Sequence, residues 1–273
     1  MVSQEQRRRQ LAREKFLRQQ QRRTSARRRT HTRNAVIAAV VGVVVAGGAT
    51  AYATGVFESD GKKTNAGAEA TPSATPTSKA PDPCEKPAEG QVKSLTWKKE
   101  PAVTIDKAAA YTMKMATTCG DIDIALKASA APHTVNSFAF LAGKGYFDHT
   151  KCHRLTTNGI YVLQCGDPTA QGSGGPGYTI PDENLKDTTL KGNVYPAGTI
   201  AMANTGQKHT GGSQFFLVYQ DSQLPPSYTP FGTISKSGMT VLKKIAAAGE
   251  STGQGDGAPN ATVVVNKLTV TKS

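Results

Sequence analysis

The chain has 273 residues and a formal net charge of +13 at pH 7, but most of this charge lies at one end. Residues 1–33 carry twelve lysines and arginines against two glutamates, a net charge of +10, so the other 240 residues carry only +3. This excludes a strongly basic folded part. We expect residues 1–33 to form a basic cytoplasmic tail on anionic lipid, with no nucleic-acid partner. An arginine-rich arm that itself binds nucleic acid or lipid remains the alternative.

Residues 34–57 contain no charged side chain. A helix of about 20 apolar residues spans a bilayer, so this segment is predicted to be a single transmembrane helix that serves as a signal anchor. The excess of Lys and Arg before it places the amino terminus in the cytoplasm and the rest outside the cell membrane. The small-x-small sequence Ala51-Tyr52-Ala53 leaves open a cleaved signal peptide and a secreted product. Under both hypotheses the remaining chain is exported.

Residues 58–90 are rich in Pro, Ala, Ser and Thr and have no apolar periodicity. This composition is typical of an extended, disordered linker. Residues 91–273 have the length of a single domain. The sequence therefore predicts a tail, a membrane helix, a linker and one extracytoplasmic domain.

Short strand-like runs dominate the domain, and two segments have helical spacing. The first helix is predicted to begin near Pro132 and to end at Gly143 to Gly145, and the second contains Met239 to Ala246 and ends at Gly249. This mixture favours a mainly β fold, a closed antiparallel barrel with helices at its ends, although composition alone does not separate it from a sandwich. The expected strands are 111–116, 122–126, two in a hairpin at 150–167, 199–203, 214–219, 230–234 and 262–270.

The stretch Thr150–Asp167, TKCHRLTTNGIYVLQCGD, is predicted to be that hairpin. Asn158 and Gly159 tolerate positive φ at its turn. If the turn centres near Gly159, Arg154 and Gln164 lie almost opposite each other. A guanidinium has five donors in a rigid fork, and an amide oxygen can hold it in place. From this stretch alone, an ordinary surface contact is the simpler interpretation.

A second stretch, Thr199–Tyr219, places two strands around a loop rich in Gly and Thr. Its adjacent Phe215 and Phe216 point to opposite faces of a strand, so one enters the core and the other can line a pocket. Both stretches belong to a series of ordered motifs. The motifs are APHTVNSF at 131–138, HR at 153–154, QCGD at 164–167, GGPGY at 174–178, MAN at 202–204, GSQFF at 212–216 and PFG at 230–232. Together they resemble the cyclophilin family of peptidyl-prolyl isomerases over about residues 109–270, in a membrane-anchored bacterial, actinobacterial-like form. The resemblance implies a closed eight-stranded barrel capped by two helices.

The resemblance also implies roles for single residues. Arg154 matches the catalytic arginine of the family and Gln164 the glutamine that orients it. Gln223 stands where the family often has Trp, which puts cyclosporin binding in doubt. Tyr228 stands where it often has His. The implied substrate-binding residues are Phe216 as the proline pocket, Tyr161, Val162 and Leu224 as further walls, Ala203 and Asn204 as the backbone-binding segment, and Tyr228.

Four cysteines in an exported domain predict disulfides, with three possible connectivities. The hairpin that places Arg154 near Gln164 also brings Cys152 close to Cys165. We therefore predict a Cys152–Cys165 disulfide, which leaves Cys84 to pair with Cys119.

The function implied by the resemblance is that of a peptidyl-prolyl cis-trans isomerase (EC 5.2.1.8) that accelerates rotation of X–Pro bonds in exported proteins. It requires no cofactor and no metal. His149, Cys152 and His153 are close in sequence but lack further ligands at regular spacing. The alternative is a non-catalytic module at the cell envelope that binds proline-containing peptides. The client proteins, the preferred residue before proline and the oligomeric state are not indicated.

Overall fold

The computed structural model describes residues 81–272 of the chain. The expected basic tail (1–33), the expected membrane helix (34–57) and residues 58–80 of the expected linker lie outside the described residues. Between residues 81 and 272, no helix has the length and apolar character needed to span a bilayer.

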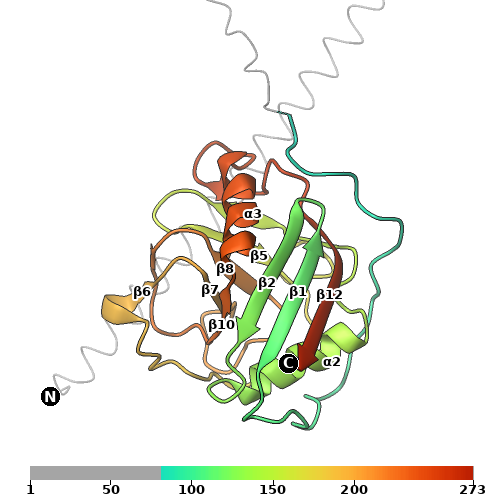
Figure 1. Ribbon diagram of the computed structural model, residues 1–273, viewed down its shortest axis with the longest axis vertical. Helices are drawn as coiled ribbons and strands as arrows, with labels where there is room; N and C mark the ends of the chain where they lie inside the picture. Colours follow the sequence, from blue (N-terminus) through green and yellow to red (C-terminus); the bar gives the residue numbers. More distant parts are fainter. Residues whose placement is uncertain (1–80, 273) are drawn as a thin grey trace, which may run out of the picture. The chain divides into compact units, whose positions relative to one another are not determined.

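A curled antiparallel sheet forms the framework of the domain (Figure 1). Its ten strands follow the order β11-β4-β5-β8-β7-β10-β2-β1-β12-β3, and a separate two-stranded sheet pairs β6 with β9. The strands are β1 (Tyr111–Thr117), β2 (Gly120–Leu126), β3 (Thr150–Lys151), β4 (Arg154–Thr156), β5 (Val162–Cys165), β6 (Val194–Tyr195), β7 (Thr199–Met202), β8 (Phe215–Val218), β9 (Ser222–Gln223), β10 (Pro230–Ile234), β11 (Asp256–Gly257) and β12 (Val264–Lys272).

Nine of these ten strands coincide with the eight that were expected, and β11 was not expected. β3 and β4 are parts of one stretch, residues 150–156, and β11 is a two-residue pairing beside β4. Within that stretch β3 pairs with β12, while β4 pairs with β5. Between the two pairings, Cys152 N donates to Val263 O at 3.0 Å and His153 N donates to Gln164 O at 3.1 Å. Residues 150–156 therefore join the two ends of the sheet order.

Side-chain alternation along the strands builds the core. Met113 on β1 pairs with Ile124 on β2, and Met115 pairs with Ile122. All four side chains are fully buried, because residues two apart in a strand share one face. Lys114, between the two methionines, is exposed and forms an ion pair with Asp121 at 2.7 Å.

The two predicted helices are confirmed as α2 (Pro132–Gly143) and α3 (Lys236–Ala247). α2 packs against β12 and α3 against β2, so the helices lie at separate places on the sheet (Figure 1). Phe138 of α2 is fully buried and its ring contacts three other buried phenylalanines, Phe147, Phe215 and Phe231. These contacts connect α2 to β8 and β10.

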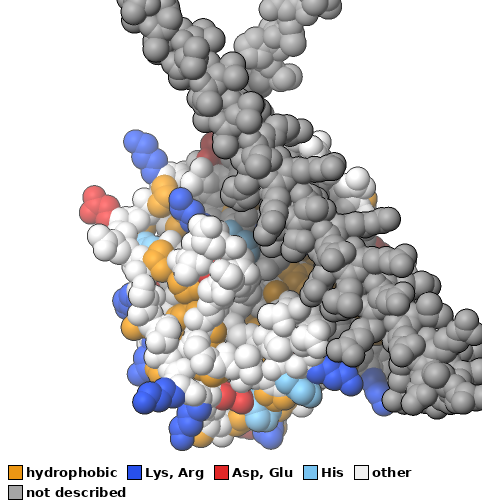
Figure 2. Space-filling view, turned by 180° about the vertical axis from the view of Figure 1, so that it is seen from behind, with side chains coloured by type: hydrophobic (Ala, Val, Ile, Leu, Met, Phe, Trp, Pro, Cys, Tyr) orange, Lys and Arg blue, Asp and Glu red, His pale blue; other side chains and the backbone are white. Residues whose placement is uncertain are grey.

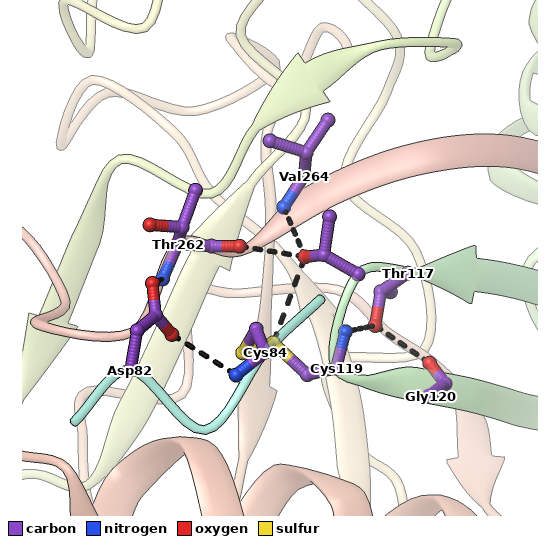
Figure 3. Close-up of a disulfide and its surroundings, with 8 residues drawn as sticks. Asp82, Cys84, Thr117, Cys119, Gly120, Thr262 and Val264 are labelled. Carbon is purple, nitrogen blue, oxygen red and sulfur yellow. Dashed lines mark hydrogen bonds between the residues drawn. A yellow bond between two sulfur atoms is a disulfide. The ribbon is translucent and has the colours of Figure 1, made fainter. Parts of the chain in front are cut away.

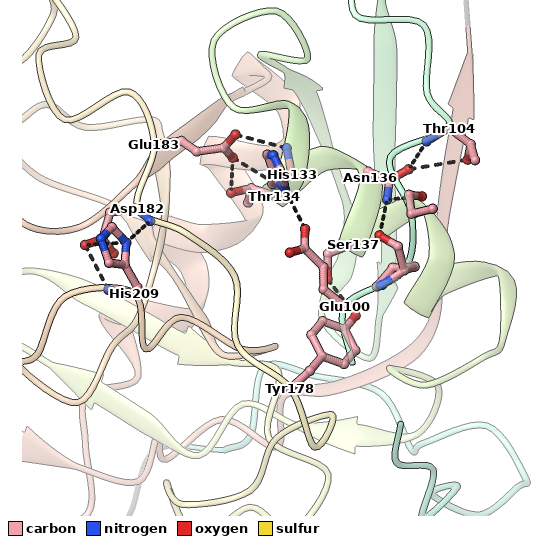
Figure 4. Close-up of polar contacts among 12 residues, drawn as sticks. Glu100, Thr104, His133, Thr134, Asn136, Ser137, Tyr178, Asp182, Glu183 and His209 are labelled. Carbon is pink, nitrogen blue, oxygen red and sulfur yellow. Dashed lines mark hydrogen bonds and ion pairs between the residues drawn. The ribbon is translucent and has the colours of Figure 1, made fainter. Parts of the chain in front are cut away.

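The amino terminus of α2 is capped from a distant loop (Figure 4). Its own preceding residue, Ala131, offers no capping side chain. Instead, Glu183 accepts hydrogen bonds from the backbone N–H groups of His133 and Thr134, at 3.0 and 2.9 Å, and from the Thr134 hydroxyl at 2.8 Å. A carboxylate there complements the helix dipole. The contact fixes the loop that begins near residue 180 against α2.

Residues 81–105, which we call the strap, have no regular secondary structure but are attached to the domain at several points. The predicted Cys84–Cys119 disulfide is confirmed and links the strap to the β1–β2 turn (Figure 3). The Asp82 carboxylate accepts from Cys84 N at 3.0 Å and from Thr262 N at 2.9 Å. Among the described residues, contacts with the domain therefore include Asp82 and Cys84, which lie within the stretch 58–90 that composition assigned to the linker.

The strap also reaches a loop that matters for the site below. Trp97 N donates to Pro176 O at 2.8 Å. The Trp97 ring packs edge-on against Phe140 of α2, with ring centroids 5.1 Å apart, and at a tilt against Tyr146, with centroids 6.0 Å apart. The only tryptophan of the chain therefore supports the glycine-rich loop at residues 172–177 from outside.

Candidate active site

Arg154 on β4 and Gln164 on β5 are direct partners across the hairpin, as the turn at Gly159 predicted. Arg154 Nη1 donates to Gln164 Oε1 at 3.2 Å. The predicted Cys152–Cys165 disulfide is confirmed and cross-links the two arms of the hairpin beside this pair. The bridge limits sliding of one arm past the other, so the guanidinium has a rigid base.

Arg154 is held on a second side by Asp256 of β11. Nε donates to Oδ1 and Nη2 donates to Oδ2, both at 2.7 Å. This contact with Asp256 raises the pKa of Arg154, although partial burial of the guanidinium acts in the opposite direction. Arg154 is therefore a permanent cation with a fixed orientation.

The guanidinium lies at the edge of a small cavity of about 120 Å³. Phe216 and Tyr228 form one side of it, with their rings edge-on and their centroids 5.4 Å apart. Phe216 belongs to a buried apolar cluster that includes Tyr195 and Val218. The cavity thus combines an apolar slot with one cation. Its lining residues are Arg154, Ile160, Val162, Gln164, Ala203, Asn204, Phe216, Leu224 and Tyr228.

All predicted catalytic and substrate-binding residues except Tyr161 line the small cavity. The Tyr161 ring packs edge-on against Tyr219, with ring centroids 5.9 Å apart. Ile160 and Val162 line the cavity instead, because neighbours in an extended chain point to opposite sides.

A larger cavity of about 660 Å³ adjoins the small one. Gln164, Ala203 and Asn204 line both cavities, so together they form one surface depression with two compartments. The walls of the large cavity are mostly backbone and small polar groups. They come from the loops 172–179, 203–205 and 210–214.

A series of amide hydrogen bonds connects the two compartments. Gln164 Nε2 donates to Gln214 Oε1 at 2.9 Å, and Gln214 Nε2 donates to Gly174 O at 2.9 Å. Since Gln164 also accepts from Arg154, each amide has one defined orientation. The position of the guanidinium is therefore coupled to the loop around Gly174.

Asp167, which directly follows β5 and Gly166, organises that loop. Its side chain is fully buried. The carboxylate accepts hydrogen bonds from Thr169 N at 2.7 Å, from Ser173 N at 3.0 Å and from Gly174 N at 3.1 Å. Burial alone would raise the pKa of Asp167, but these hydrogen bonds outweigh burial and lower it. The loop is thus held in place by hydrogen bonds to an ionised carboxylate.

Two histidines lie close to the site but not in either cavity. His153 has two ring nitrogens that are buried and have no hydrogen-bond partner among residues 81–272, and burial lowers its pKa. His209 is on the rim and exchanges hydrogen bonds with Asp182, each 3.0 Å long (Figure 4). Cys152, near His153 in sequence, is in a disulfide, so its sulfur is not a thiolate ligand.

On the face drawn in Figure 2, lysine and arginine side chains lie mainly toward the left and lower margins, with hydrophobic and uncharged side chains between them and a few acidic and histidine side chains. Gln223, at the position expected for a rim tryptophan, is exposed on β9 and lines neither cavity.

Gln214 and Asp256 are among the residues of the site that were not identified from the sequence. Gln214 lies two positions before Phe216 in the GSQFF motif, and alternation along a strand could have placed both side chains on one face. Asp256 had no such signal, because it contacts Arg154 across a separation of 102 residues.

Comparison with known proteins agrees with this geometry. The sequence profile of the cyclophilin type peptidyl-prolyl cis-trans isomerase/CLD family matches residues 112–270, which include every residue that lines the two cavities. The chain belongs to this family. Cyclophilins of solved structure include one from Cryptosporidium parvum, described as a cyclophilin type peptidyl-prolyl cis-trans isomerase. It superimposes with a TM-score of 0.50 at 25% identity and covers 60% of this chain and 99% of that one.

Similar cyclophilin sequences occur in several bacteria. A probable peptidyl-prolyl cis-trans isomerase B of Mycobacterium leprae is 51% identical over 168 residues, which cover 59% of this chain and 57% of that protein. Its counterpart from Mycobacterium tuberculosis is 46% identical and the match covers 54% of it. The chain thus spans little more than half the length of these two relatives. Peptidyl-prolyl cis-trans isomerase B of Bacillus subtilis is 39% identical over 46% of this chain and 82% of its own.

Proposed function

We propose that this cyclophilin is an active peptidyl-prolyl cis-trans isomerase, with Arg154 as its catalytic residue. The observation that carries the proposal is the placement of one fixed guanidinium at the edge of an apolar slot formed by Phe216 and Tyr228. The slot is suited to a prolyl ring, and the guanidinium lines the same cavity, so it is available to the nitrogen of that ring.

The reaction needs no nucleophile and no proton transfer. Rotation about an X–Pro bond breaks amide resonance and has a barrier of about 18–20 kcal/mol. In the twisted state the prolyl nitrogen becomes pyramidal and gains a lone pair, which a guanidinium N–H can bind. Because this interaction is stronger in the twisted state than in the planar one, it lowers the barrier. A reduction of about 7 kcal/mol would accelerate rotation roughly 10⁵-fold.

The remaining lining residues have complementary roles. Gln164 keeps the guanidinium in one orientation through its 3.2 Å contact. Ala203 and Asn204 line both cavities, so their backbone groups are the candidates to pair with an extended substrate that crosses from one compartment to the other. With the substrate backbone held there and the ring in the slot, only the X–Pro bond is left to rotate.

We also propose that the domain acts on exported proteins at the outer side of a membrane. The uncharged segment 34–57 behind a basic tail supports an anchor. Two disulfides within residues 81–272 support an oxidising compartment. Two separate experiments test this proposal: carbonate washing of isolated membranes, and protease digestion of intact cells. Release by carbonate, or protection of the domain in intact cells, would contradict the proposal.

The enzymatic test compares the full-length protein with its Arg154→Ala variant on a short X–Pro peptide. We expect kcat/KM to fall about 10²- to 10³-fold, because one preorganised donor at the reacting atom is lost. Lys151→Ala is the matched control: it removes an exposed cation three residues away and should leave kcat/KM unchanged. If the folded protein binds the peptide but does not accelerate rotation, it is instead a proline-binding module.

A further inference from the structure

We infer that Asp256 is a positioning residue of the isomerase site, which holds the guanidinium of Arg154 in its working orientation before substrate arrives. This inference rests on the proposed function, because it assigns to Asp256 an effect on the reaction that Arg154 carries out. Asp256 lines neither cavity, so its effect passes through Arg154.

The contact has the geometry of a specific clamp. The two carboxylate oxygens bind two different nitrogens, Nε and Nη2, along one edge of the guanidinium, each at 2.7 Å. A bidentate pair fixes the plane of the guanidinium as well as its distance. Gln164 binds the third nitrogen, Nη1. Within the part of the chain that the structure describes, three of five N–H donors are thus engaged, and one N–H on each of Nη1 and Nη2 is left for a substrate.

Asp256 is itself fixed in place by its loop. β11 pairs with β4, with Asp256 opposite Thr156 and Gly257 opposite Leu155. The preceding turn is closed by the buried carboxylate of Glu250, which accepts from Thr252 N at 2.6 Å and from Gly255 N at 2.8 Å. Both partners of the ion pair therefore stand on neighbouring strands of one sheet. A carboxylate on a flexible loop could not orient the cation in this way.

The ion pair between Arg154 and Asp256 is too exposed to contribute much to the stability of the fold, so stability does not account for it. The side chains of Arg154 and Asp256 are 37% and 56% exposed, and pairs of this kind contribute little to folding. Lys114 and Asp121 form a comparable pair at 2.7 Å, with 51% and 52% exposure, and neither lines a cavity. The Asp256 pair differs in being bidentate and in involving Arg154, which is the only arginine after residue 33.

The test compares Asp256→Asn and Asp256→Ala with Asp121→Asn, all in the full-length protein, on an X–Pro peptide. Asparagine retains one acceptor but not the bidentate clamp. We expect Asp256→Asn to lower kcat about tenfold and to change KM less than twofold, because orientation matters most in the twisted state. Asp121→Asn should match the unmodified protein. Unchanged kcat in both Asp256 variants, or a higher kcat, would overturn the inference while leaving the isomerase activity established.

A double-mutant cycle and a spectrum separate positioning from stability. In an Arg154→Lys background, Asp256→Ala should have less than half its effect on log kcat, since lysine cannot form the clamp; full additivity would overturn the inference. The Nε–H resonance of Arg154, identified by its loss in Arg154→Lys, should shift in Asp256→Asn and stay in place in Asp121→Asn. An unmoved resonance contradicts the clamp. If the folded unmodified protein shows no acceleration, the proposed function and this inference fail together.

Discussion

The two compartments of the site are built in different ways. The small cavity is lined mainly by side chains of strands and of residues that directly adjoin them, above an apolar cluster around Phe216. The large cavity is lined by loops, and buried polar groups such as Asp167 hold part of its wall in place. Side chains that project from a sheet are positioned by the ladder of backbone hydrogen bonds. A wall made of loops has no such ladder and depends on buried polar groups such as Asp167.

We therefore expect changes in the small cavity to affect catalysis, and changes in the large cavity to affect stability and the response to acid.

The sharpest test of the small cavity is Phe216→Ala. Truncation of a buried phenylalanine lowers the free energy of unfolding by about 3–5 kcal/mol, and it removes the apolar surface that would bind the prolyl ring. We expect kcat/KM to fall by about 100-fold or more at a temperature where the variant is still folded, for a loss of about 3 kcal/mol of apolar contact. Circular dichroism during the assay confirms folding. Thr210→Ala in the large cavity is the control, and an equal loss there would remove the distinction.

The disulfide beside Arg154 should link stability to activity. Replacing Cys152 and Cys165 together by serine opens a cross-link between residues 13 apart, which lowers the free energy of unfolding by about 3 kcal/mol. Because the bridge joins the strands that carry Arg154 and Gln164, kcat should fall as well. The matched control replaces Cys84 and Cys119, which are 35 residues apart on the strap side. Denaturant titration and assay of both variants should show loss of stability in both, but loss of kcat only in the first.

Asp167→Asn tests the large cavity. The amide keeps the shape of the side chain but presents one acceptor instead of two, which should lower the free energy of unfolding by about 1–3 kcal/mol at neutral pH. The pKa of Asp167 is lowered in the folded protein, so its contribution to stability is complete above the ordinary carboxyl pKa and is lost as the pH falls through the lowered value. Denaturant titrations between pH 7 and 3 should show a shallower decline for Asp167→Asn. Parallel curves would contradict this role of the carboxylate.

The smallest expected effect is the pH response of His153. Burial lowers its pKa, so the folded state favours the neutral ring. The contribution of this neutral ring to the free energy of unfolding is complete above about pH 6.5, the pKa of an unfolded histidine, and is lost as the pH falls below that value. His153→Gln should therefore make stability less dependent on pH between about 6.5 and 5. His209→Gln is the comparison, because His209 is exposed on the rim. A pH slope that is unchanged by His153→Gln would exclude this histidine as the source.

Local pattern was sufficient for most of the framework. Pro132 and the glycines near 143 predicted α2, and alternation predicted the long strands. The turn at Asn158 and Gly159 set the register that pairs Arg154 with Gln164 and brings Cys152 to Cys165. These features depend on residues close in sequence, so the chain itself contains the information.

The sequence by itself thus determined the family, the hairpin, both disulfides and the identity of the guanidinium in the small cavity. Only the tertiary structure decided which face Tyr161 takes, that Gln214 links the two compartments, and that Asp256 grips Arg154. The physical reason is distance along the chain. The geometry of a tight turn and the alternation of side chains along a strand depend on neighbouring residues, whereas β11 pairs with β4 only after the whole sheet has formed.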